Sequence, residues 1–78
     1  MTPVMRTAMA VALAGDPDRA VRIMQVARVH GRTVRRALRA AHDRAVVLYT
    51  AHDDAGYRVY QRWTAALQSV VDARWGYA

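Results

Sequence analysis

The chain opens with an apolar segment of helical character. Residues 3 to 14 are apolar apart from Arg6 and Thr7, Pro3 suits a first helical position, and Gly15 suits a helix end. Apolar side chains recur here every three or four residues, which is typical of a helix and not of a strand. The pattern therefore predicts a helix over residues 3–14 that is buried on nearly all sides.

A second helix is predicted to start at Asp16-Pro17-Asp18 and to run to about His30, where Gly31 would end it. An aspartate cap, a proline in the first turn and a second acid near the positive end of the helix dipole all favour this start. Its expected apolar face consists of Ala20, Ile23, Met24 and Ala27, with Val26 as a further candidate.

The third predicted helix, roughly residues 33 to 42, has two opposite faces. Thr33 is its expected N-cap. The apolar positions are Val34, Ala37, Leu38 and Ala41. Four arginines at positions i, i+3, i+4 and i+7 lie on the other face: Arg32, Arg35, Arg36 and Arg39. We call these four residues the arginine stripe.

Beyond Arg44 the pattern has two interpretations. Residues 46–50 are rich in β-branched and aromatic side chains, residues 53–56 suit a turn with Gly56 in the left-handed position, and residues 57–63 alternate. This favours a β-hairpin over residues 45–63, in a mainly α fold with three core helices and a C-terminal helix. The alternative is an all-α four-helix domain, because Ala45 and Leu48 also continue the helical spacing. In either case Thr64 to Trp75 should be helical, with Gly76 at its end.

Composition and charge limit what this domain can do. The 78 residues fit a single domain over residues 1–78, and the absence of cysteine leaves stability to apolar packing. The net charge is +6, and the segment from Arg28 to Arg44, with six arginines and one aspartate, supplies 6 − 1 = 5 of it. Such a local positive charge favours a polyanionic partner.

Several classes of function are not expected. The chain has no cysteine nucleophile, no glutamate and no glycine-rich phosphate loop, and His30, His42 and His52 lack the spacing of a metal site. We therefore expect a non-enzymatic protein with no cofactor and no metal. The apolar run before Gly15 is too brief for a membrane span or a leader, so we expect a cytoplasmic protein.

The order of elements resembles the winged helix-turn-helix domain of GntR-type and MarR-type bacterial transcription regulators. The segments that carry the resemblance are Ala27-Arg28-Val29-His30-Gly31, Thr33-Val34-Arg35-Arg36-Ala37-Leu38, Asp43-Arg44-Ala45-Val46-Val47 and Asp54-Ala55-Gly56-Tyr57-Arg58-Val59. It implies that the third helix is a recognition helix for duplex DNA and that residues 45–63 form the wing. Because Asp53 and Asp54 would occupy the wing tip, we do not expect that tip to contact phosphates.

A recognition helix of this kind would read DNA with arginine, which can bind guanine O6 and N7 through two hydrogen bonds. The residues expected at the nucleic acid are Arg28, Arg32, Thr33, Arg35, Arg36, Arg39 and Arg44. Arg28 and Arg44, at the two ends, are expected on phosphates. The working hypothesis is a small DNA-binding protein, such as a transcription regulator of bacterial, phage or mobile-element origin.

One alternative function has the same composition. A non-enzymatic interaction module, for example a phage or mobile-element inhibitor or adaptor, could use the arginine stripe against an acidic protein surface. A homodimer through residues 3–14 and 64–75 is also expected, since their apolar side chains suit an interface.

Overall fold

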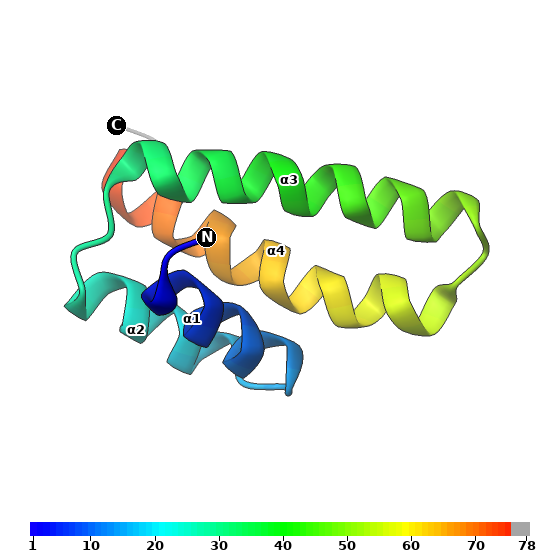
Figure 1. Ribbon diagram of the computed structural model, residues 1–78, viewed down its shortest axis with the longest axis horizontal. Coiled ribbons are helices and arrows are strands. Elements are labelled where there is room, and N and C mark those ends of the chain that lie inside the picture. The colour runs from blue at the N-terminus through cyan, green and yellow to red at the C-terminus, as the bar shows by residue number, and fades with distance from the viewer. Residues whose placement is uncertain (76–78) are drawn as a thin grey trace.

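Four helices make up the part of the chain that the computed structural model describes, which is residues 1–75, with side chains for residues 1–73. They are α1 (Pro3–Leu13), α2 (Pro17–Val26), α3 (Gly31–Thr50) and α4 (Asp54–Trp75). Figure 1 shows two antiparallel helical hairpins: α3 and α4 run along the long axis, and the shorter α1 and α2 pack below α4.

Each helix begins at a residue whose side chain accepts a hydrogen bond from a backbone N–H of the first turn. These N-caps are Thr2 for α1, Asp16 for α2, His30 for α3 and Asp53 for α4. Such caps satisfy donors that have no partner inside the helix. The expected starts at Pro3 and Asp16-Pro17 are therefore confirmed, whereas Thr33 is not a cap and lies inside α3.

The core is built around α4, which packs against all three other helices. Trp63 is 2% exposed and is the largest side chain in this core. The other buried residues of the core cluster are Met5, Ala8, Ala12, Ala20, Met24, Val34, Ala41, Ala66, Leu67 and Val70. Five of these eleven residues are alanine, and small side chains let helix backbones approach closely.

The β-hairpin expected over residues 45–63 is wrong. Residues 45–50 continue α3, residues 54–63 begin α4, and no strand occurs among the described residues. Ala41 and Ala45 are buried on the face of α3 that packs on α4, so the helical spacing prevails over the strand preference of Val46 and Val47. The fold agrees with the all-α four-helix alternative.

The turn between α2 and α3 also differs from the expectation. α2 ends at Val26 instead of His30, and Arg28 takes the left-handed conformation with φ 52°. Gly31 does not end α2, because it is the first residue of α3. α2 packs on α1 and α4, while α3 packs on α4. Residues 45–63 form no hairpin, and α2 does not pack on α3. The winged arrangement is therefore absent from the described residues.

The segments expected to form a dimer use their apolar faces inside the chain. Met5, Ala8 and Ala12 of α1 are buried in the core, as are Leu67 and Val70 of α4. α1 is not buried on all sides, since Arg6 and Thr7 are exposed. The expected helix end at Gly76 lies outside the described residues. No helix within residues 1–75 is long and apolar enough to cross a membrane.

Candidate nucleic-acid interface

The arginine stripe lies on the outer face of the first half of α3. All four of its residues are exposed, whereas Val34 and Ala41 on the opposite face are buried against the rest of the fold. Because a helix turns about 100° per residue, positions 32, 35, 36 and 39 stay within one side of the helix. The fold thus brings these four guanidinium groups onto one surface.

The stripe borders a depression of about 530 Å³ at the start of α3. Its lining residues are His30, Gly31, Arg32, Arg35, Arg36 and Arg39. None of the lining residues is acidic. A concave surface surrounded by arginine, at the positive end of a helix dipole, attracts anionic groups.

His30 organises the rim of this depression. Its Nδ1 accepts a hydrogen bond from the backbone N–H of Arg32 at 3.1 Å and so caps α3. The sequence pattern placed His30 at the end of the second helix and did not predict it as a cap. Its position one residue before a helix start was the signal that it could be a cap.

The segment that contains the stripe carries a strong excess of positive charge. Residues 28 to 39 contain five arginines and no carboxylate. Within the described part of the chain, no carboxylate forms an ion pair with Arg32, Arg36 or Arg39. Exposed guanidinium groups without a carboxylate partner keep their donors available for an anionic ligand.

The other predicted residues are placed differently. Arg28 is exposed in the turn before α3, next to the stripe in sequence. Thr33 is half-buried and lines a separate groove between α3 and the start of α1. Arg44 is exposed, but five residues of helix rotate it about 140° away from Arg39. Arg28 therefore lies in the turn that precedes the stripe and does not line the depression, and Thr33 and Arg44 lie outside the stripe.

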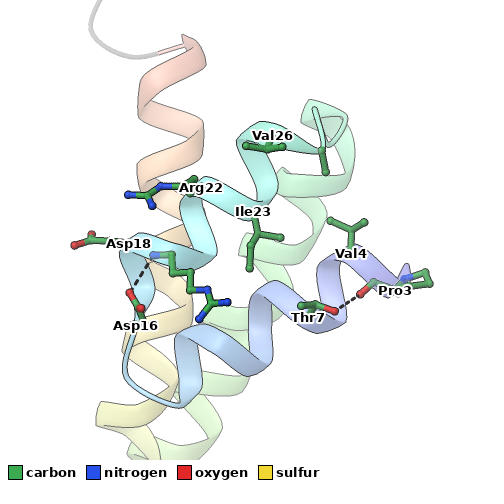
Figure 2. Close-up of a pocket in the computed structure, with 10 residues that line it drawn as sticks. Pro3, Val4, Thr7, Asp16, Asp18, Arg22, Ile23 and Val26 are labelled. Carbon is green, nitrogen blue, oxygen red and sulfur yellow. Dashed lines mark hydrogen bonds between the residues drawn. The ribbon is translucent and has the colours of Figure 1, made fainter.

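A second hollow, of about 650 Å³, lies between α1 and α2. Figure 2 shows Val4 and Ile23 pointing into it from the two helices, with Asp16, Asp18 and Arg22 toward one end. Its apolar floor and its charges of both signs suit a polyanion less well than the arginine-lined depression does. Within residues 1–75, no three side chains of the metal-ligating kinds come together.

Comparisons of the chain with protein-family models, curated proteins and solved structures found no match. The functional interpretation therefore starts from the geometry and charge of α3.

Proposed function

We propose that this chain binds duplex DNA through the arginine stripe of α3. The observation that carries the proposal is the depression whose lining contains all four arginines and no acidic residue. Guanidinium groups bind phosphate oxygens and guanine edges with two parallel hydrogen bonds. The protein is proposed to act as a binding module, without chemistry of its own.

The dimensions of the stripe suit a groove of DNA. Arg32 and Arg39 are separated by about 10 Å along the helix axis, at 1.5 Å per residue. The major groove of B-form DNA is about 12 Å wide, which accepts a helix of about 10–12 Å diameter, and the stripe would follow about 10 Å of the length of that groove. Since α3 packs on α4 with its opposite face, its outer face is free to approach the duplex.

Contact is proposed at one end of the molecule only. Asp53 and Asp54 lie at the turn between α3 and α4, and Thr50 lies about 20 Å from Arg36 along the helix. Carboxylates at that distance from the stripe do not oppose phosphates bound to it, because the Debye length is about 8 Å at physiological salt. We therefore place the DNA at the start of α3 and the acidic turn away from it.

The test compares two charge-reversed double variants with the same net charge. Arg32→Asp with Arg36→Asp removes two guanidinium groups of the stripe, and both sites are exposed. Arg6→Asp with Arg22→Asp makes the same change on α1 and α2, also at exposed sites. We expect the stripe variant to lose at least about 100-fold in duplex affinity, since each charge-assisted contact between arginine and phosphate contributes about 1.5–3 kcal/mol. The control should lose much less.

Fluorescence anisotropy with a random-sequence duplex, at several salt concentrations, measures both effects. The wild-type slope of log affinity against log salt should be about −0.9 per phosphate contacted, and the stripe variant should lose about 1.8 of that slope. Equal losses in the two variants would reduce the proposal to a net-charge effect. Selection from a random duplex library would then show whether sequence is read.

A second candidate for the partner is another protein with an acidic surface. It is favoured by the exposed apolar residues Val46 and Val47, which follow the stripe on α3. It predicts no measurable duplex affinity at physiological salt for wild-type protein. That result would contradict the DNA proposal and support this alternative.

A further inference from the structure

The far end of α3 exposes a group of large apolar side chains. Val46 is 61% exposed, Val47 is 52% exposed and Tyr49 is 65% exposed. We call these three residues the tip patch. The other two exposed large apolar residues in the described chain, Met1 and Val26, come from separate elements. At the tip three of them fall within four residues of α3: Val46 and Val47 flank its outer face, and Tyr49 lies beside Val46 on the side that faces Tyr57 of α4.

The tip patch is ordered by its neighbours but not covered by them. The ring of Tyr49 meets the ring of Tyr57 on α4 edge to face, with centroids 5.5 Å apart. A shallow hollow of about 240 Å³ there is lined by His42, Ala45, Val46, Tyr49 and Tyr57. Figure 1 shows this end of the α3–α4 hairpin extending past the α1–α2 hairpin. The fold itself supplies no element to bury the patch.

Charge distinguishes the tip from the other end of α3. Residues 43 to 58 contain three aspartates and two arginines, whereas residues 28 to 39 contain five arginines and no carboxylate. One end of the α3–α4 hairpin is therefore slightly negative and the other strongly positive. Two such hairpins attract each other most when they lie antiparallel.

We propose that Val46 and Val47 of the tip patch form the interface for a second copy of this chain, with the two α3 helices antiparallel and a twofold axis between these two residues. Residues whose numbers add to 93 then lie opposite each other. Val46 faces Val47 of the second copy, Asp43 faces Thr50, and Arg39 faces the region of Asp54. Positions 36, 39, 43, 46 and 50 are spaced by three or four residues, so they share one side of α3.

A second copy of the chain accounts for both the exposed apolar side chains and the negative charge of the tip. A twofold interface buries the same apolar patch from each side and forms each charge contact twice. An acidic partner protein would meet the stripe but would be repelled by Asp53 and Asp54. In the antiparallel pair, Arg32 and Arg36 lie past the end of the other copy's α3, whereas Arg39 of the arginine stripe lies opposite the region of Asp54. Arg39 is therefore shared by the two proposed surfaces, and association is measured without DNA.

Sedimentation equilibrium without DNA tests the interface. The wild-type chain should dimerise, and Val46→Asp with Val47→Asp should weaken association at least about 100-fold, because each change places a carboxylate in an apolar contact. Val26→Asp is the matched control, since Val26 is 78% exposed on α2, and it should associate like wild type. A monomeric wild-type chain at several hundred micromolar, or equal effects of both variants, would overturn the proposal.

The register is tested by charge exchange and by a thiol. Asp54→Arg should weaken the dimer about tenfold, and adding Arg39→Asp to the same chain should restore it. Because the chain has no cysteine, Val46→Cys provides a single thiol. Mild oxidation should cross-link it as a dimer, while Val26→Cys should stay monomeric. If Arg39→Asp does not restore the dimer of Asp54→Arg, and if Val46→Cys and Val26→Cys cross-link equally, the antiparallel register is rejected. DNA affinity enters none of these measurements, so the two proposals fail separately.

Discussion

Two residues other than glycine in the described chain occupy a backbone conformation that favours glycine. Gly15 follows α1 with φ 115°, and the equivalent positions after α2 and α3 hold Arg28 with φ 52° and His52 with φ 59°. In each turn the next residue donates its N–H back into the helix, as Asp53 does to the carbonyl of Leu48 at 2.9 Å. These are the helix ends at which a left-handed residue closes the last turn.

Replacing His52 with glycine should stabilise the protein. A residue with a Cβ pays about 1–2 kcal/mol in the left-handed region, and part of this gain is offset by the greater freedom of glycine when unfolded. We expect His52→Gly to raise the free energy of unfolding by up to about 1 kcal/mol in urea titrations. Ala51→Gly is the neighbouring control: its φ is −81°, so it should lose about 0.5–1 kcal/mol. Destabilisation by both changes would contradict the assigned turn.

At the scale of elements, the starts of the first two helices were predictable and residues 45–63 were ambiguous. The starts of α1 and α2 follow from Pro3 and from Asp16-Pro17, whose preferences are local. In residues 45–63, local preference and helical spacing disagree. Packing selects the helix in this segment, because Ala45 of α3 and Trp63 of α4 are both buried. Long-range packing thus overrides the weak preference of Val46 for strands.

The candidate site was predictable where it depends on helical spacing alone. The shared face of Arg32, Arg35, Arg36 and Arg39 follows from their positions. The role of His30 as a cap does not follow from the sequence, since histidine is not among the residues that most favour caps. The position of the turn before Gly31 could not be predicted either, because this turn requires Arg28 to adopt a positive φ. The depression beside the stripe depends on both features.

A proline at position 44 distinguishes the continuous helix from the hairpin. Arg44 is exposed inside α3, which spans Gly31–Thr50. Proline there removes a helix hydrogen bond and clashes with the preceding turn, so Arg44→Pro should cost about 3 kcal/mol or more. The same residue would lie in a tolerant linker if a strand began at 45. Asp54→Pro places proline at the first position of α4 and should be nearly neutral. Far-ultraviolet circular dichroism during urea unfolding measures both variants.

On the scale of the whole molecule, α4 is the element that joins the two hairpins. It packs on α3 along one side and on α1 and α2 along another. Arg62 adds a polar link, since its Nη1 donates to the backbone oxygen of Leu13 at 3.3 Å. The arginine stripe and the tip patch therefore lie on a helix that is held in place by α4. Their relative positions depend on how firmly α4 is packed.

The side chain of Trp63 should contribute a large share of the stability of the four-helix fold. It is buried at the centre of α4, and truncating a buried tryptophan to alanine costs about 3–5 kcal/mol. A chain of this length has a total stability of about 4–12 kcal/mol, at about 0.05–0.15 kcal/mol per residue. We expect Trp63→Ala to lose most of its cooperative unfolding transition in urea, and Trp63→Phe to keep a weakened one. Tyr49→Ala, at an aromatic residue 65% exposed, should cost only about 1 kcal/mol by losing its contact with Tyr57. A Trp63→Ala transition as steep and as late as that of Tyr49→Ala would show that α4 is not the element on which the fold depends.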